Sequence, residues 1–313
     1  MTLRLVTLAV LIVAAGASWA FSGFFGKDLL TEIAILAIFA MSLDLLAGYT
    51  GMVSLGHAAF FGVGAYGMAA AGSLLGLGGL PAMAVAVAAA MALALIVGVF
   101  VVRLKGVFFI MITLAVGQMV HAWVFRSEAL GGDDGMGGII RPDLGTIGLV
   151  LDDPADFALF ALVLAFLSFL ALDLVARSPF GRLLTAIHQS ESRARALGCP
   201  VERYKLGAYV IAAAFAGLAG ALAAQRDYFV SPEFLTWTVS GEVLIVVIVG
   251  GMGSLLGPVI GAAVVTLLKH QLSDVTTYWM FFLGLFFVLV VMFADRGLYG
   301  ALRRLKRRRE AAT

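Results

Sequence analysis

Few residues of this chain have side chains that commonly catalyse reactions or bind metals. The 313 residues include four histidines and one cysteine: His57, His121, His188, His270 and Cys199. No two histidines have the spacing of metal ligands, and no GxxxxGK[ST], nucleophile-elbow or HExxH motif is present. The sequence therefore predicts no metal site, no cofactor and no enzymatic activity. Any ATP hydrolysis would take place in another chain.

A second group of polar residues lies within apolar sequence and could contact a solute or an ion. Charged groups in lipid are costly, so they tend to face a protein interior or a water-filled path. Asp44 could either fix the backbone near Tyr49–Gly51 or contact a solute, and Glu242 could either cap a helix or pair with an ammonium group. The candidate path comprises Asp44, Tyr49, Gly51, Ser54, His57, Gln118, Glu242, Gly251, Gly253 and Ser254.

The composition predicts that these residues lie in a membrane. Hydrophobic residues make up 62% of the chain and charged residues 13%, and the mean hydropathy is +1.05. A soluble domain carries about 25% charged residues. An all-α polytopic membrane protein follows, in which each span needs about 20 apolar residues. The expected spans are 5–25, 33–49, 52–76, 80–101, 107–125, 157–176, 206–224 and 276–294, together with an unusual stretch at 241–268.

The first of these spans imitates a signal peptide, because Arg4 and an apolar run precede Ser18-Trp19-Ala20. Only one basic residue precedes the run, however, and the apolar sequence continues past the small residues. We expect a retained span.

The distribution of Lys and Arg predicts the orientation. Basic residues gather in the short loop at 103–105, in 178–205 and in 295–313, whereas 127–156 is acidic. Because cytoplasmic loops carry the excess of Lys and Arg, we expect 127–156 to be an external loop, 178–205 a cytoplasmic loop and 295–313 a basic cytoplasmic tail. Both termini are then cytoplasmic, and 1–313 forms a single transmembrane domain.

The stretch at 241–268 conflicts with this orientation if it forms one helix. It is interrupted by "GGMGSLLGP", Gly250–Pro258, and Gly with Pro is a strong helix breaker. Two shorter helices joined by a break restore the even number of crossings that puts both termini in the cytoplasm. The fold then has about eight full spans plus a broken pair, eight to ten helices in all. Such breaks are tolerated where the backbone is buried in protein or lines a cavity. An ordinary kinked span is the alternative.

A short internal repeat supports the break. "GMVSL" at 51–55 recurs as "GMGSL" at 251–255, and internal repeats are common in transporters. Gly253, Gly257 and Gly261 form a smooth ridge that could allow close helix packing or leave room for a solute.

The charged segment 178–205 is predicted to contain one amphipathic helix. Ser178-Pro179 is a helix-start signal, apolar residues recur at helical spacing from Gly181, and Gly198 is a stop signal. This helix could lie on anionic lipid, or it could dock in a groove of a cytosolic protein. Its apolar face offers Leu, Ile and Ala rather than Trp or Phe, which favours a protein partner.

Several motifs in order along the chain resemble the permease subunits of bacterial ABC importers of the branched-chain amino-acid class. They are "SLDLLAGYTGMVSLGHAAFFGVGAY" (42–66), "RLKGVFFIMITLAVGQMV" (103–120), "GGDDGMGGI" (131–139), "AAAFAGLAGAL" (212–222), "VVIVGGMGSLLGPVIGAAV" (246–264) and "FADRGLYG" (293–300).

The resemblance implies a coupling helix at 181–198 that fits a groove in an ATP-binding subunit. At His188-Gln189 the chain departs from the family, which commonly has Arg-Glu. The implied partners are two ATP-binding cassette subunits, a second related permease, a periplasmic solute-binding protein and membrane lipid, and no nucleic acid. The coupling residues would be Gly181, Arg182, Ala186, Glu191, Arg195, Ala196, Leu197 and Gly198.

The implied function is import across the bacterial inner membrane by alternating access. Branched-chain amino acids, urea, short amides and aromatic acids are all solutes of this class, and the sequence does not choose among them. A stand-alone ion-coupled secondary transporter is the main alternative, but it has no use for a docking helix. A membrane enzyme would need a converging set of catalytic groups that the chain lacks.

Overall fold

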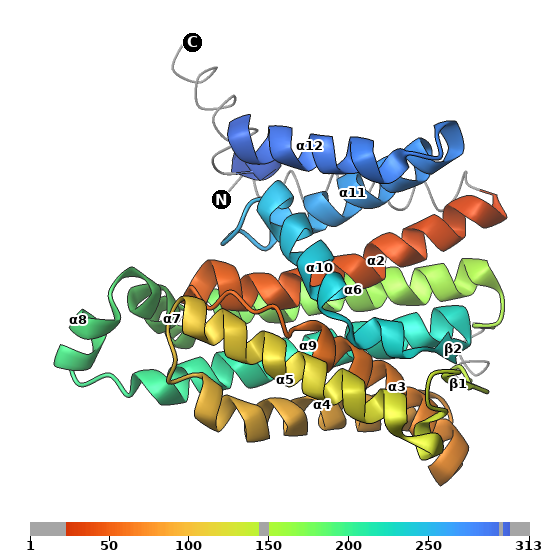
Figure 1. Ribbon diagram of the computed structural model, residues 1–313, viewed down its shortest axis with the longest axis horizontal. Coiled ribbons are helices and arrows are strands. Elements are labelled where there is room, and N and C mark those ends of the chain that lie inside the picture. Colours follow the sequence, from red (N-terminus) through yellow and green to blue (C-terminus); the bar gives the residue numbers. More distant parts are fainter. Residues whose placement is uncertain (1–22, 144–149, 294–296, 301–313) are drawn as a thin grey trace.

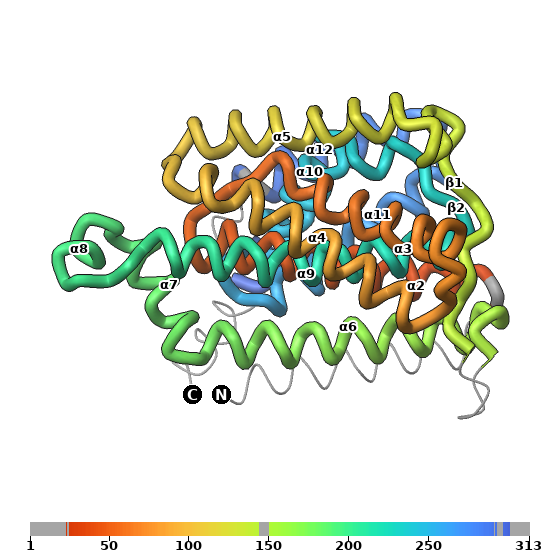
Figure 2. The backbone as a smooth tube through the Cα atoms, turned by 90° about the horizontal axis from the view of Figure 1, so that it is seen from below, coloured from red at the N-terminus to blue at the C-terminus, as the bar shows by residue number. Residues whose placement is uncertain are grey.

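The computed structural model describes residues 23–143, 150–293 and 297–300. Long helices run side by side across the molecule, as Figures 1 and 2 show. In chain order they are α2 (Phe24–Asp44), α3 (Ala58–Leu75), α4 (Gly79–Val101), α5 (Val107–Arg126), α6 (Pro154–Arg177), α7 (Pro179–Gln189), α8 (Glu191–Ala196), α9 (Val201–Asp227), α10 (Trp237–Gly250), α11 (Leu256–Val275) and α12 (Trp279–Phe293).

Short irregular elements connect these helices. They are a π-helix at Leu45–Thr50 that extends α2, 3-10 helices at Glu128–Leu130 and Pro232–Leu235, and strands β1 (Met136–Gly137) and β2 (Phe229–Val230). The two strands pair antiparallel, Met136 opposite Val230, and so fasten the acidic loop to the end of α9.

The predicted all-α polytopic fold is confirmed, but the predicted count of eight full spans is not. In the described residues, six helical segments are long and apolar enough to cross a membrane: Phe25–Thr50, Ala58–Leu75, Gly79–Val101, Val107–Arg126, Pro154–Arg177 and Val201–Asp227. The predicted span 52–76 starts only at Ala58, and 276–294 shortens to α12. Most of the predicted span 5–25 and of the basic tail 295–313 lies outside the described residues, and so do both termini.

The predicted break in 241–268 is present. α10 ends at Gly250 and α11 begins at Leu256. Gly251 and Gly253 both have positive φ, which is open to glycine because it has no Cβ. In α11, Gly257 and Gly261 lie against the backbone of Gly250 and Val246. At Gly257 and Gly261 the glycine ridge therefore packs α11 closely against α10.

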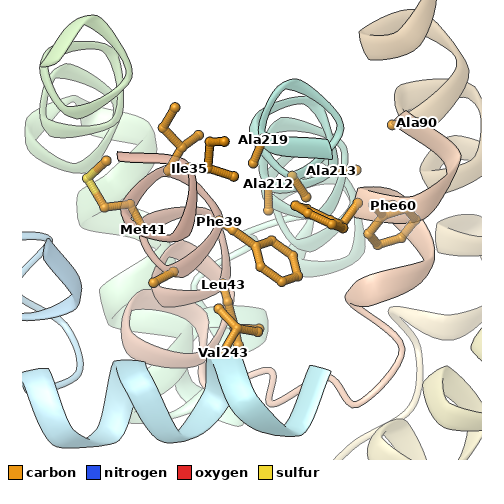
Figure 3. Packing of buried hydrophobic residues seen from close by; sticks show 14 of the residues in the cluster. Ile35, Phe39, Met41, Leu43, Phe60, Ala90, Ala212, Ala213, Ala219 and Val243 are labelled. Carbon is orange, nitrogen blue, oxygen red and sulfur yellow. The ribbon is translucent and has the colours of Figure 1, made fainter. Parts of the chain in front are cut away.

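α2, α3 and α9 form the centre of the molecule. In the most apolar window of each span, 78% of α2 is buried and 61% of α3 and of α9, against 22–28% in α4, α5 and α6. Small residues let these helices approach: Gly64 of α3 lies against Gly217 of α9, and an alanine row of α4 spaced by four residues is fully buried. Figure 3 shows Phe39 and Leu43 of α2 meeting side chains of α3, α9 and α10.

Two units of the chain, each made of a central helix, an irregular stretch and a second helix, run in opposite directions. Asp28, near the start of α2, bonds Arg226, near the end of α9, at 2.7 and 2.9 Å, so α2 and α9 are antiparallel. Each is followed by a non-α-helical stretch, 51–57 and 228–236, and then by α3 or α10. The Ser240 hydroxyl, near the start of α10, accepts from the amide of Ala58, the first residue of α3, at 2.8 Å. α3 and α10 therefore begin beside each other inside the bundle.

Candidate functional site

The segment 178–205 projects beyond one end of the bundle (Figure 2). Ser178 caps α7 by accepting from the amide of Gly181 at 3.3 Å, as the start signal predicts. The prediction of one continuous helix is wrong, because the chain breaks at Ser190. That residue is extended and its hydroxyl accepts from the amide of Arg193, which starts the short helix α8. Gly198, with φ +80°, lies just past the end of α8.

The predicted coupling residues fall into two groups, those that are covered and those that are exposed. Gly181 is buried against Val175 and Ala176, and Glu191 is largely covered. Leu197 is 88% exposed although it is apolar. The remaining predicted residues are also exposed: Arg182, Ala186, Arg195, Ala196 and Gly198.

Glu191 joins α8 to two other parts of the bundle. Its carboxylate lies 2.7 Å from Arg195 of α8, 2.9 Å from Lys205 of α9 and 3.3 Å from Lys105 of the α4–α5 loop. Arg195 also pairs with Glu202 at 2.5 Å. Partial burial raises the pKa of Glu191, but hydrogen bonds from Arg195, Lys205 and Lys105 outweigh burial and lower the pKa to about 2. Glu191 is therefore ionised at neutral pH and anchors α8.

Sequence reasoning missed Lys105 and Lys205, since they lie far from Glu191 along the chain and no local spacing links them. His188 is exposed, and its Nδ1 lies 3.1 Å from the carbonyl of Gly48 in the π-helix. A cavity of about 460 Å³ separates 50–53 and the start of α5 from α7 and α8, with His188, Glu191 and Lys205 in its wall.

Asp44 binds backbone within the break between α10 and α11 rather than near Tyr49–Gly51. It is fully buried at the end of α2, and its two oxygens accept from the amides of Gly253 at 2.6 Å and Leu255 at 3.1 Å. Leu255 has φ +49°, a strained value for a residue with a Cβ. Asp44 thus holds the unwound turn before α11, where free helix amides attract a carboxylate.

The other predicted path residues near this end are structural or peripheral. Ser254 donates to the carbonyl of Gly251 at 2.9 Å and accepts from the amide of Gly257 at 2.9 Å. Ser54 is buried and accepts from the amide of Gly56 at 3.3 Å. Tyr49 is half-buried, and Gly51, with φ +73°, lies against the ring of His188.

His57 lies in the interior of the bundle. It is fully buried, its Nε2 lies 2.8 Å from the hydroxyl of Ser42, and its ring stacks on Phe39 at 5.4 Å between centroids. The Ser42 hydroxyl donates to the Phe39 carbonyl at 2.6 Å, so it accepts from His57. This leaves Nδ1 of His57 as a buried acceptor with no partner among the described residues.

The remaining two candidates lie away from these groups. Gln118 is half-buried on α5, and its Nε2 lacks a hydrogen-bond partner in the described part of the chain. The Glu242 side chain on α10 is 46% exposed and its Oε1 lies 3.8 Å from Nζ of Lys269 on α11. The ten predicted path residues therefore do not form one site.

In the half of the bundle away from α7 and α8, charged residues that the sequence did not predict fasten the helices together. Arg226 bonds Asp28 and Glu32 of α2, and His270 of α11 lies 3.1 Å from Glu32. The guanidinium of Arg141 lies between the rings of Phe157 and Tyr228, at 4.0 and 4.2 Å from their centroids. Across 23–143, 150–293 and 297–300, no three His, Cys, Asp or Glu residues are grouped to bind a metal.

A bundle with a broken helix pair and a charged segment projecting from one end defines a polytopic membrane protein of the transporter class. The family model for the permease component of branched-chain amino acid transport systems matches residues 27–291. The chain belongs to this family, and it is a multi-pass protein of the bacterial inner membrane.

Individual relatives agree with the family. The chain is 32% identical to the high-affinity branched-chain amino acid transport system permease protein LivM of Salmonella typhimurium, over 94% of this chain and 74% of that protein. It is 33% identical to LivM of Escherichia coli, over 95% and 74%. The xylose transport system permease protein XylH of Haemophilus influenzae is 30% identical over 49% and 42%. No solved structure matches the chain.

Proposed function

We propose that this chain is a permease subunit of an ATP-driven importer that moves branched-chain amino acids, or related small polar solutes such as urea and amides, by alternating access. The family and the LivM relatives support the solute class. ATP hydrolysis takes place in two separate ATP-binding cassette subunits. A second related permease and a periplasmic solute-binding protein complete the importer.

The exposed surface of α7 and α8 carries this proposal. Hydrogen bonds and ion pairs fix both helices to the bundle from the inside, through His188 and Glu191, while Leu197 and Arg182 face outward. An exposed apolar side chain beside basic residues suits a protein groove. A stand-alone ion-coupled transporter is less well supported, because both oxygens of its best candidate ion ligand, Asp44, already accept backbone hydrogen bonds.

The charge distribution supports a cytoplasmic position for this end. Arg103, Lys105 and the basic residues of α7 and α8 lie there, whereas the described parts of the acidic loop, 127–143 and 150–156, lie at the opposite end beside β2. Cytoplasmic loops carry the excess of Lys and Arg. The solute-binding protein would then dock on the end that carries 127–156.

Purification of the tagged chain from its native membrane, with identification of the proteins that accompany it, tests the proposal. The wild type is expected to bring ATP-binding subunits, and Leu197→Asp to lose most of them, because the change places a charge in an apolar contact. Val150→Asp makes the same change at a 61% exposed residue of the opposite end and should keep the subunits.

Two results would contradict the proposal. A wild-type chain that purifies without ATP-binding subunits in mild detergent would refute the importer itself. Retention of those subunits by Leu197→Asp would refute the assignment of α8 as their docking helix.

A further inference from the structure

An ion pair on the surface of the bundle is exposed at membrane depth. The side chains of Glu242 and Lys269 are 46% and 37% exposed. Glu242 lies two residues after Ser240, and the Ser240 hydroxyl bonds the start of α3 inside the bundle. Lys269 precedes His270, which reaches Glu32 two turns into α2. Both charges therefore lie between the two ends of the membrane-spanning helices.

This position requires water or a polar partner. Charged side chains within the hydrocarbon layer face the bundle interior or a water-filled cavity. α10 packs against both α5 and α12. The exposed side chains of those two helices are mostly apolar, such as Met111 and Met119 of α5 and Leu285 and Met292 of α12. The charged side chains of Glu242 and Lys269 thus lie among mostly apolar exposed side chains.

The pair continues a row of polar groups along the chain before it. Glu233 and Thr238 are exposed, and the hydroxyls of Thr236 and Thr238 lie 2.7 Å apart. This row, 233–242, includes the non-α-helical stretch that precedes α10. Irregular backbone at membrane depth is tolerated where it is buried in protein or lines a water-filled cavity, and exposed polar side chains favour the second case.

The Glu242 carboxylate and the Lys269 ammonium are free to bind a further partner besides each other. Their separation of 3.8 Å exceeds the 2.7–3.2 Å of a hydrogen bond, and within the described residues no hydrogen bond reaches either head group. One carboxylate and one ammonium, close together and accessible, complement the ammonium and carboxylate of an α-amino acid. Trp237, 53% exposed and five residues before Glu242, offers an apolar surface for the solute's side chain.

We propose that Glu242 and Lys269 are a recognition pair for zwitterionic solutes on a water-filled path, Glu242 binding the solute ammonium and Lys269 its carboxylate. This inference rests on the proposed import function and narrows its solute class to amino acids. A neutral solute such as urea would have no need of either charge.

Cysteine labelling tests whether the pair faces water. In a Cys199→Ser background, Glu242→Cys is treated with a membrane-impermeant methanethiosulfonate and compared with Phe166→Cys, a 37% exposed position on the apolar outside of α6. We expect Glu242→Cys to react at least tenfold faster, and leucine with its binding protein and ATP to change that rate. Equally slow reaction at both positions would overturn the proposal.

Transport by the complete importer in proteoliposomes tests recognition. For Glu242→Gln, Lys269→Gln and the double variant, we expect assembly and stimulated ATP hydrolysis within twofold of wild type, with at least a tenfold loss of leucine uptake per ATP. Arg177→Gln, which neutralises a 55% exposed charge of α6, is the control and should leave uptake unchanged.

The outcomes separate this inference from the proposed function. Wild-type uptake of leucine together with full uptake by the double variant would refute the recognition pair alone. Loss of the second permease on purification of the double variant would instead place the pair in a subunit interface and also overturn it. Failure of the wild-type importer to take up leucine would refute the proposed function.

Discussion

At the scale of single residues, Glu191 has the densest ionic contacts at the basic end of the molecule. Its carboxylate holds Lys105, Arg195 and Lys205, which come from three different parts of the chain. A pKa lowered to about 2 means that folding favours the ionised form. The stabilisation is full above the unfolded pKa, near 4.5, and is lost as the pH falls toward 2.

The first prediction concerns this pH dependence. Glu191→Gln should lower the heat-unfolding midpoint of the purified protein at pH 6, and the gap to wild type should shrink as the pH falls from about 4.5 to 3. Glu202→Gln, which removes a 39% exposed partner of the same Arg195, should produce a smaller gap at pH 6. A gap for Glu191→Gln that is unchanged between pH 6 and pH 3 would show that its ionisation does not stabilise the fold.

Residue types alone identified Asp44 as unusual but not its partners. A lone acid in an apolar run predicts a buried or functional group, which is correct. Its hydrogen bonds to Gly253 and Leu255 depend on a contact across about 210 residues, which only the packing of α2 against α10 and α11 creates. Lys269, the partner of Glu242, was missed for the same reason.

At the scale of elements, the close approach of Gly48 to Gly253 joins the end of α2 to the break between α10 and α11. A Cβ on Gly48 would meet the Asp44 carboxylate and the backbone nitrogen of Gly253. Because the obstructing atoms are mainly backbone, they cannot move aside as a flexible side chain could.

Gly48→Ala should therefore destabilise the protein by about 3 kcal/mol or more, the upper part of the range for overpacking. Thermal unfolding in detergent measures the effect. Gly72→Ala in α3 is the matched control, since its Cβ would have only ordinary contacts at 3.8 Å and alanine favours a helix. Equal stability of the two variants would contradict the close approach.

Helix breaks were predictable where Gly and Pro mark them. The break at Gly250–Pro258 was correct for that reason, whereas the break at Ser190 was missed. Ser190 fits helical spacing as a polar surface residue, and its role as the cap of α8 is visible only once its extended backbone is known. The short α8 is held by Glu191 rather than by its own helix propensity, because six residues are too few for a stable isolated helix.

At the scale of the whole molecule, composition and apolar periodicity predicted the fold class and the approximate position of most helices. They missed the irregular stretch 51–57, because most of it falls in the apolar run predicted as the span 52–76, whereas 228–236, which contains Pro232, lies outside every predicted span. Charge clustering, by contrast, correctly placed Lys105 and the residues of α7 and α8 at one end.

The orientation itself can be measured with Cys199, the single cysteine of the chain, which follows α8 and is half-buried. A membrane-impermeant maleimide should label it in inside-out vesicles and spare it in intact spheroplasts, because the basic end faces the cytoplasm. Asp134→Cys in a Cys199→Ser background is expected to show the reverse. Labelling of Cys199 from outside would invert the topology.

The shortness of α10 has a consequence for the lipid around the protein. Its 14 residues measure about 21 Å, less than the roughly 30 Å of a hydrocarbon core. The outer helices α4, α5 and α6 are long enough to span that core, and they must tilt when bilayer thickness changes. α10 instead takes its position from Ala58 and from the glycines of α11. Changes in bilayer thickness therefore act on the outer helices first and reach α10 only through the protein.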